Sequence, residues 1–200
     1  LAAEASRQNE KFICWHQKQR PFVHLKLAMS LDGRISLGPS VSTALSGGAA
    51  LERVHELRHE HDAILIGGNT AAVDDPSLTD RSGRERRRPL VRVVLDNRLQ
   101  TSVDAQVFRT AKDVPTLVFT NSTNADKIRS LRDRGVEVTE LDMGGRDLAG
   151  VLAKLKEREI QSVLVEGGTE VAGAFVDAGL VDKVTFIYRS EEHTSELQSH

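Results

Sequence analysis

Short apolar runs alternate with helix-like segments along most of this chain. Helices are predicted for "SGGAALERVHELRHEH", for 124–134 and 147–158, and for the stretch that ends at Ala178. Parallel strands need crossover connections, usually helices, so the alternation predicts one domain with a doubly wound α/β fold and a mostly parallel sheet covered on both faces. The predicted strands are 22–29, "DAILIGG", "LVRVVLD", "PTLVFT", "VEVTEL", "SVLVE" and "KVTFIY".

The charge balance and the single cysteine limit the classes of function. The 200 residues include 27 Lys and Arg against 29 Asp and Glu, and a formal net charge of −2 offers no basic field for nucleic acid. Cys14 is the only cysteine of the sequence, so an internal disulfide is excluded. No apolar run approaches the roughly 20 residues of a membrane helix. We therefore expect a cytoplasmic protein that binds small molecules, with no nucleic-acid or membrane partner.

Two glycine pairs follow predicted strands. In parallel sheets ligands bind beyond the carboxyl ends of strands, where Gly67-Gly68 and Gly167-Gly168 would both lie. The second pair precedes a helix, so free backbone N–H groups and the helix dipole could hold an anion whose phosphates approach the glycine backbone. A plain strand-to-helix turn would contain the same residues, and the motif alone leaves both readings open.

One local pattern suggests a different chemistry. "HELRH", residues 55–59, fits the H-E-x-x-H pattern of zinc hydrolases. Arg58 would place a cation beside the metal, the helix ends soon after His59, and Asp62 and Leu65 stand where the extended pattern needs glycine and histidine. A solvated helix face with charge pairs is the favoured interpretation, and a zinc metallopeptidase stays an alternative.

Residues 68–88 show no periodic pattern and are predicted to form a long loop, of a kind that in a compact domain is usually functional or disordered. Within it, Asp74 and Asp75 could accept hydrogen bonds from a cofactor or a ribose, and Arg81 could bind a phosphate through its fork of donors. A turn with surface charges is the alternative. The basic run "RERRR", 84–88, could attract a nucleotide phosphate, although a solvated loop is the favoured interpretation.

Four stretches together resemble one family. In order they are "RPFVHLKLAMSLDGRISL", "STALSGGAALERVHELRHEHDAILIGGNTAAVDDPSLTDR", "RVVLD" and "LVEGGTEVAGAFVDAGLVDKV". They resemble the reductase domain of the bifunctional riboflavin-biosynthesis deaminase/reductases, over residues 20–188. The resemblance implies a dihydrofolate reductase-like fold. It also implies that NADPH delivers hydride to the ribosyl C1′ of 5-amino-6-(5-phosphoribosylamino)uracil, which opens the sugar to a ribityl chain.

The resemblance assigns roles to residues that match the family's motifs. It places the NADPH phosphates at the helix start that follows the second glycine pair. The implied cofactor-binding residues are Ala28, Ala44, Thr70, Asp74, Gly168, Thr169, Glu170, Val171, Ala172, Gly173 and Ala174. The implied substrate-binding residues are Ser42, Arg58, Leu78, Arg81 and Glu166. The two arginines suit a phosphorylated substrate, because cations can anchor its phosphate away from the hydride-transfer centre.

Two further positions bear on the site. Ala44 departs from the family, in which many members have a tryptophan against the cofactor, and this puts that stacking contact in doubt. Lys26 is predicted to be catalytic, because it points from the first strand towards the site and could polarise the C1′ region or bind phosphate. An exposed strand lysine is the alternative. No metal is expected.

The two ends of the chain carry separate expectations. Residues 1–20 resemble the connector from a deaminase domain, and the deaminase zinc signature is absent here, so we expect a missing upstream deaminase domain and a reductase domain at 21–188. "RSEEHTSELQSH", 189–200, interrupts the family pattern and looks like translated adapter sequence. We therefore expect a non-native tail on a domain that lacks its C-terminal strands, and a homodimer for the full-length protein.

Three alternatives to the uracil reductase remain beside the metallopeptidase. The first is reduction of the diaminopyrimidine before its deamination. The second is a reductase for another pteridine or pyrimidine, and the third is a nucleotide-binding remnant without catalysis.

Overall fold

The computed structural model describes residues 4–5, 8–30 and 48–189. Seven strands in this part of the chain form one sheet, in the order β5-β4-β3-β2-β6-β1-β7, and every paired strand runs parallel to its neighbour. The predicted α/β fold is thereby confirmed. The strands are β1 Phe22–Ser30, β2 Ala63–Gly67, β3 Val91–Leu95, β4 Thr116–Thr120, β5 Glu137–Glu140, β6 Ser162–Glu166 and β7 Lys183–Arg189. Residues 190–200 of the expected tail lie outside the described residues.

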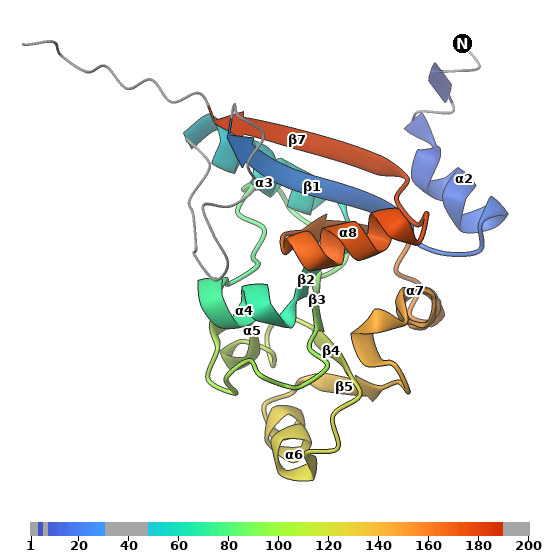
Figure 1. Ribbon diagram of the computed structural model, residues 1–200. Helices are drawn as coiled ribbons and strands as arrows, with labels where there is room; N and C mark the ends of the chain where they lie inside the picture. The colour runs from blue at the N-terminus through green and yellow to red at the C-terminus, as the bar shows by residue number, and fades with distance from the viewer. Residues whose placement is uncertain (1–3, 6–7, 31–47, 190–200) are drawn as a thin grey trace, which may run out of the picture.

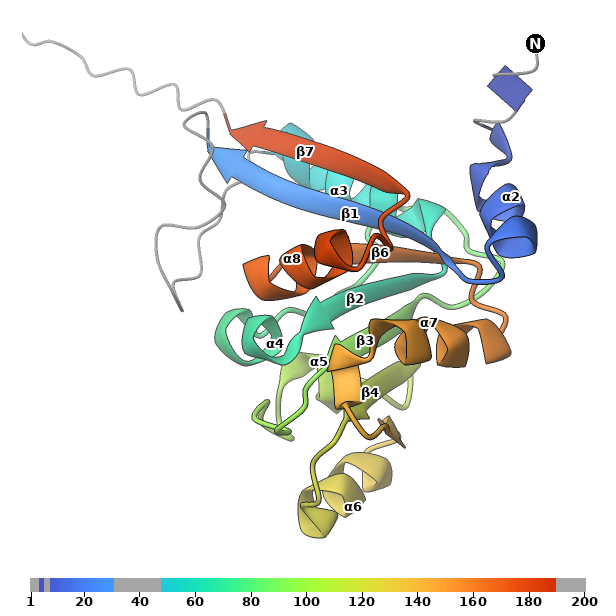
Figure 2. The same cartoon turned by 45° about the vertical axis from the view of Figure 1, so that its right-hand side comes forward.

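Helices cover both faces of the sheet. Alternate strand residues point to opposite faces and pack there in two separate hydrophobic cores. Leu65 of β2 packs in the core that contains Leu152 and Phe175, whereas its neighbour Ile64 packs with Phe108 in the other core. Figures 1 and 2 show α8 in front of the sheet and α3 behind β1. The α-helices are α2 Glu10–Gln17, α3 Gly48–Glu60, α4 Gly68–Asp74, α5 Gln106–Arg109, α6 Ala125–Asp133, α7 Leu148–Glu157 and α8 Thr169–Asp177, and η1 Gly144–Arg146 is a 3₁₀ turn.

The strand order reverses beside β2. The chain lays down β2, β3, β4 and β5 in one direction and then returns through α7 to insert β6 between β2 and β1. In open α/β sheets such a reversal leaves a crevice outside the carboxyl ends of the strands, and ligands bind there. Gly67, which ends β2, and Glu166, which ends β6, both lie at this reversal.

The structure corrects the prediction of one long loop at 68–88. Its first part, Gly68–Asp74, is helix α4. Ala71 is the apolar residue that this short helix buries in the core, so the sequence shows no helical periodicity. Asp75 ends the helix in the left-handed region with φ of 40°, and the irregular segment begins there.

The amino-terminal segment is bound to the sheet. Asp182, just before β7, accepts hydrogen bonds from Arg20 Nη1 at 2.6 Å, from Lys18 Nζ at 2.6 Å and from the Val23 backbone N–H at 2.8 Å. Lys183 Nζ also contacts Glu10 Oε1 of α2 at 2.6 Å. These contacts fix α2 against β1 and β7. No helix in the described ranges is long and apolar enough to cross a membrane.

Candidate functional site

Three charged side chains meet at the carboxyl end of β6. Glu166 is buried, and it receives two hydrogen bonds from Arg58, Nε to Oε1 at 2.7 Å and Nη2 to Oε2 at 3.0 Å. Lys26 is the register partner of Glu166 on β1, and its Nζ lies 3.6 Å from Oε2. Arg58 from α3 and Lys26 from β1 therefore both contact the Glu166 carboxylate of β6 at the strand-order reversal.

Arg58 reaches this carboxylate because of its direction on α3. Helical side chains point back towards the helix N-terminus, so an arginine in the last turn can extend towards the carboxyl edge of the sheet. Its Nη1 donates to the Thr79 carbonyl oxygen at 3.0 Å, so each of the three guanidinium nitrogens has a hydrogen-bond partner. Most of its donors are thus already used within the protein.

The surrounding charges keep Glu166 ionised. Burial by itself raises the pKa of this carboxyl, but the hydrogen bonds and charge of Arg58, together with the charge of Lys26, lower it further than burial raises it. The net pKa of Glu166 lies below its ordinary value. The site therefore presents a carboxylate acceptor beside the Lys26 ammonium group.

Arg81 lies on the irregular segment that follows α4. Its Nε donates to Thr79 Oγ1 at 3.1 Å and its Nη2 to Ser77 Oγ at 3.3 Å, while its backbone N–H donates to His55 Nδ1 at 3.2 Å. Its side chain is exposed and forms no ion pair within the described ranges. Arg81 therefore remains available to an anion.

Two predicted ligand residues of this segment already have contacts within the protein. Leu78 is 2% exposed and packs its side chain in the core, so a substrate contact at this residue would involve its backbone. Asp75 accepts a hydrogen bond from the Gln106 backbone N–H at 2.7 Å and thereby caps α5. Asp74, at the end of α4, is exposed.

The second glycine pair forms a tight turn before α8. Gly167 and Gly168 have φ of 87° and 79°, a region that favours glycine. A Cβ on Gly168 would lie 3.1 Å from Thr70 Oγ1, so Thr70 of α4 borders this turn. The turn and the N-terminus of the nine-residue helix α8 could hold the phosphates of a dinucleotide.

The other predicted cofactor residues lie around this turn or outside the described part. Thr169 and Glu170 are exposed in the first turn of α8, whereas the side chain of Ala172 is 6% exposed and faces the core. Ala172 can therefore contact a ligand through its backbone only. Ala28 is half-buried on β1, Val171 and Gly173 are half-buried on α8, and Ala174 is exposed there. The predicted residues Ser42 and Ala44 lie outside the described residues.

A polar hollow at the carboxyl ends of the strands was not predicted from the sequence. Asn97 and Arg98 follow β3, and the hollow also contains Arg146 of η1. Within the described part of the chain, neither arginine side chain has a hydrogen bond or an ion pair. The polar residues that directly follow two of the strands were the sequence signal that could have predicted this hollow. The hollow is lined by Asn97, Arg98, Asn121, Ser122, Thr123 and Arg146.

The "HELRH" histidines have separate partners. His55 accepts from the backbone of Arg81, whereas His59 Nδ1 lies 2.9 Å from Asp80 Oδ2. The described residues hold no group of three or more His, Cys, Asp or Glu side chains that could bind a metal. The arrangement supports a role of this helix in carrying Arg58.

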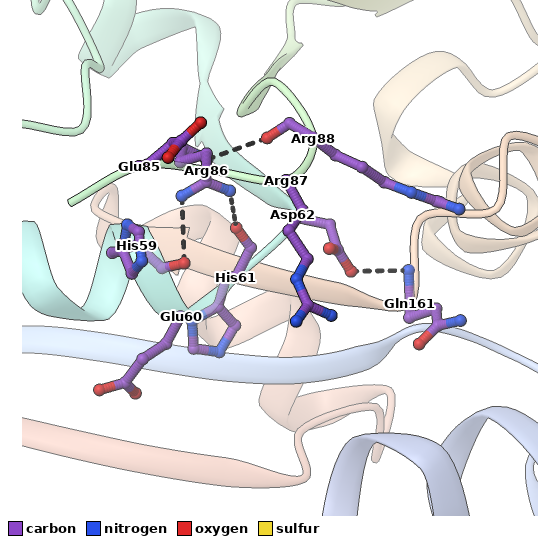
Figure 3. Close-up of a pocket in the computed structure, with 9 residues that line it drawn as sticks. All are labelled: His59, Glu60, His61, Asp62, Glu85, Arg86, Arg87, Arg88 and Gln161. Carbon is purple, nitrogen blue, oxygen red and sulfur yellow. Dashed lines mark hydrogen bonds between the residues drawn. The ribbon is translucent and has the colours of Figure 1, made fainter.

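A larger hollow of about 540 Å³ lies at the opposite edge of the sheet. Figure 3 shows Arg86 within it, hydrogen-bonded to the carbonyl oxygens of His59, in the last turn of α3, and of His61, just after the helix. Arg86 thus caps the C-terminus of α3, while the other arginines of the basic run are exposed, as expected for a solvated loop. His61 and Gln161 precede β2 and β6, so this hollow lies at the amino ends of the strands and apart from the Glu166 site.

Comparison with known proteins identifies the family. The family model described as RibD C-terminal domain matches residues 21–190. The chain belongs to the RibD C-terminal domain family. This membership confirms the resemblance drawn from the four sequence stretches, and the matched range contains Lys26, Arg58, Arg81, Glu166 and the glycine turn.

Relatives of this RibD C-terminal domain are found among bacteria and archaea. The chain is 35% identical over 186 residues to riboflavin biosynthesis protein RibD of Actinobacillus pleuropneumoniae, covering 92% of the chain and 49% of that protein. It is 36% identical over 167 residues to 2,5-diamino-6-ribosylamino-4(3H)-pyrimidinone 5′-phosphate reductase of Methanothermobacter thermautotrophicus, covering 82% of the chain and 76% of that protein. The chain spans about half the length of the RibD relative.

A solved structure supports the same fold. It comes from Thermotoga maritima and is described as a diaminohydroxyphosphoribosylaminopyrimidine deaminase/5-amino-6-(5-phosphoribosylamino)uracil reductase. Its TM-score is 0.77 at 36% identity, and the match covers 93% of the RibD C-terminal domain chain and 49% of that structure.

Proposed function

We propose that this domain catalyses the NADPH-dependent reduction of 5-amino-6-(5-phosphoribosylamino)uracil to its ribitylamino product. The observation that carries the proposal is the cluster of Arg58, Glu166 and Lys26 beside the glycine turn, at the strand-order reversal. The Thermotoga maritima structure is described with this reductase activity. The RibD relative of about twice the length, and the Thermotoga maritima structure described as a deaminase/reductase, also support a further deaminase domain in the complete protein.

The residues at the glycine turn fit a dinucleotide. Positive φ at Gly167 and Gly168 leaves room for phosphates near the backbone, and a side chain at Gly168 would fill that room. NADPH would supply the hydride from its nicotinamide ring. The protein would supply binding, orientation and the exclusion of water.

Lys26 and Glu166 would act on the sugar. As hydride reaches C1′, the bond between C1′ and the ring oxygen O4′ breaks, and O4′ must take a proton. Lys26 is a cationic donor held at the carboxyl edge by Glu166, and we assign it the delivery of this proton. Glu166 would accept hydrogen bonds from the substrate while it keeps Arg58 and Lys26 in place.

The hollow containing Arg98 and Arg146 would bind the 2′-phosphate that distinguishes NADPH from NADH. Strands lie about 4.8 Å apart, so the ends of β3 and β4 are roughly 10–15 Å from the end of β6. That spacing suits the two ends of one extended dinucleotide. The guanidinium groups of Arg98 and Arg146, which have no side-chain partner among the described residues, are well suited to a phosphate monoester.

Removing either cation should weaken NADPH binding selectively. Arg98→Gln and Arg146→Gln are each expected to raise the Kd for NADPH by about tenfold, as for a lost charged hydrogen bond, and to leave the Kd for NADH unchanged. Fluorescence titration measures both constants. Arg129→Gln, on an exposed arginine of α6, is the matched control. Equal weakening of NADPH and NADH would contradict the assignment.

Arg81 would anchor the substrate phosphate. Arg81→Ala is expected to raise KM for the phosphorylated substrate roughly 30-fold, which corresponds to a loss of about 2 kcal/mol in binding free energy. It should change KM for the dephosphorylated analogue much less. Steady-state NADPH oxidation gives both values. Arg87→Ala removes an exposed arginine from the same loop and serves as the control. Equal effects on both substrates would remove Arg81 from this role.

A second substrate has a specific observation in its favour. The archaeal relative is named for reduction of a diaminopyrimidinone 5′-phosphate. The two pyrimidines differ at the position that deamination changes, so kcat/KM measured with each, on the same protein and with NADPH, decides between them. The proposal expects a higher kcat/KM for the uracil, and the opposite ratio would assign the diaminopyrimidine.

A further inference from the structure

A fully buried arginine on β3 contacts the segment that leads to Arg81. Arg92 of β3 has an exposed fraction of 0%. Its Nε donates to Thr116 Oγ1 at 2.9 Å, its Nη1 to Thr110 Oγ1 at 2.7 Å and to the Ser77 carbonyl oxygen at 3.3 Å, and its Nη2 to the Val114 carbonyl oxygen at 3.0 Å. All four acceptors are neutral, and no carboxylate pairs with Arg92 among the residues that the structure describes.

A buried cation of this kind is costly. Desolvation disfavours the charged guanidinium, and burial lowers the pKa of Arg92 to about 10. A well-packed apolar side chain is often at least as stabilising as a buried ionic group. The distinctive contribution of Arg92 is therefore geometric, because its rigid fork joins β4, the end of α5 and the segment around Ser77 at one point.

The contact with Ser77 connects Arg92 to the site through a short chain of hydrogen bonds. Ser77 Oγ and Thr79 Oγ1 accept hydrogen bonds from Arg81, and the Thr79 carbonyl oxygen accepts from Arg58. Between them, Leu78 has φ of 49° and a buried side chain, so this stretch has little freedom to shift. Residues 77–79 thus lie between Arg92 on the core side and the two site arginines.

We propose that Arg92 is a positioning residue, which holds the Ser77 carbonyl and so sets the placement of residues 77–81 and of the two arginines that they orient. Arg92 has no exposed surface, so this role requires no contact with substrate or cofactor. Its kinetic consequence rests on the proposed function, because Arg81 and Arg58 matter to turnover only if the site takes the phosphorylated aminopyrimidine. Its structural consequence is independent of activity.

Hydrogen exchange tests the structural consequence directly. In Arg92→Met, amide exchange at residues 77–81 is expected to rise about tenfold relative to the wild type, because the segment loses a charge-assisted hydrogen bond. Exchange in α8 should stay unchanged. Thr110→Val removes one acceptor of Arg92 that lies outside the segment, so it is the matched control and should leave 77–81 near wild type. Should Arg92→Met fail to fold, Arg92→Lys permits the same comparison with a donor of poorer geometry.

Kinetics then separates positioning from general stability. We expect a higher KM for the phosphorylated substrate with an unchanged Kd for NADPH, since the glycine turn lies on other elements. Faster exchange throughout β3 and β4, or unchanged exchange at 77–81 in a folded variant, would overturn the proposal. Faster exchange confined to 77–81 in a protein that does not turn over the aminopyrimidine would support the positioning role and reject the proposed substrate.

Discussion

Glu166→Gln is expected to lower kcat/KM by roughly 100-fold or more, the largest effect of any single substitution in the site. The neutral amide cannot balance Arg58 and Lys26, both of which contact this buried carboxylate. Lys26 would lose its fixed position, and the substrate would lose a charged acceptor. Steady-state NADPH oxidation measures the loss.

The same variant should be less stable, with a defined pH dependence. Removing one partner of a buried ion pair typically costs about 3–5 kcal/mol. Because the pKa of folded Glu166 lies below its ordinary value, its contribution to stability is present above the pKa of the unfolded chain and is lost as the pH falls through the folded value. Glu166→Gln should therefore show a shallower acid-side decline in the free energy of unfolding than the wild type.

A control separates this effect from a general loss of charge. Glu170→Gln changes an exposed carboxylate in the first turn of α8 and should leave the acid-side decline in place. A folded Glu166→Gln variant with wild-type kcat/KM would exclude Glu166 from the reaction.

Gly168→Val is expected to raise the Kd for NADPH by roughly 100-fold while the far-UV circular dichroism stays near native. A branched side chain is strained at φ of 79°, and its Cβ would lie 3.1 Å from Thr70 Oγ1, in the space where phosphates would approach the backbone. Losing two charged hydrogen bonds of ordinary strength accounts for a change of this size. Fluorescence titration with NADPH measures the Kd.

Gly179→Val is the matched control for backbone strain. Gly179 follows the C-terminal end of the same helix with φ of 64°, and nothing lies within 4 Å of a Cβ there. It should weaken stability as Gly168→Val does but leave NADPH binding unchanged. If both variants bind NADPH with wild-type affinity, the phosphates do not lie at the glycine turn.

The strands could be predicted from short sequence patterns, because each pattern has a local physical cause. Branched apolar runs such as "SVLVE" need burial on both faces, and the following glycines turn the chain into a helix. The strands and the turn at Gly167 and Gly168 could be predicted for this reason. Helix α4 could not, because seven residues that bury one alanine leave no period to detect.

The partners of charged residues depend on contacts distant in sequence. Arg58 was expected to bind substrate, and the sequence holds no sign that Glu166, 108 positions later, takes two of its donors. Arg92 shows the same limit. In "LVRVVLD" it resembles a solvent-facing strand residue, yet Thr110, Thr116 and two carbonyl oxygens from other segments make its complete burial possible.

Transfer of isotope from NADPH to the sugar would show the proposed reaction directly. The purified chain is incubated with the phosphoribosylaminouracil and with NADPH carrying deuterium at nicotinamide C4, in separate reactions for the two faces of the ring. The proposed reaction predicts that one labelled form yields a ribitylamino product with a single deuterium at C1′, together with one NADP⁺ per product. A folded protein that binds NADPH but forms no such product, or places deuterium elsewhere, would contradict it.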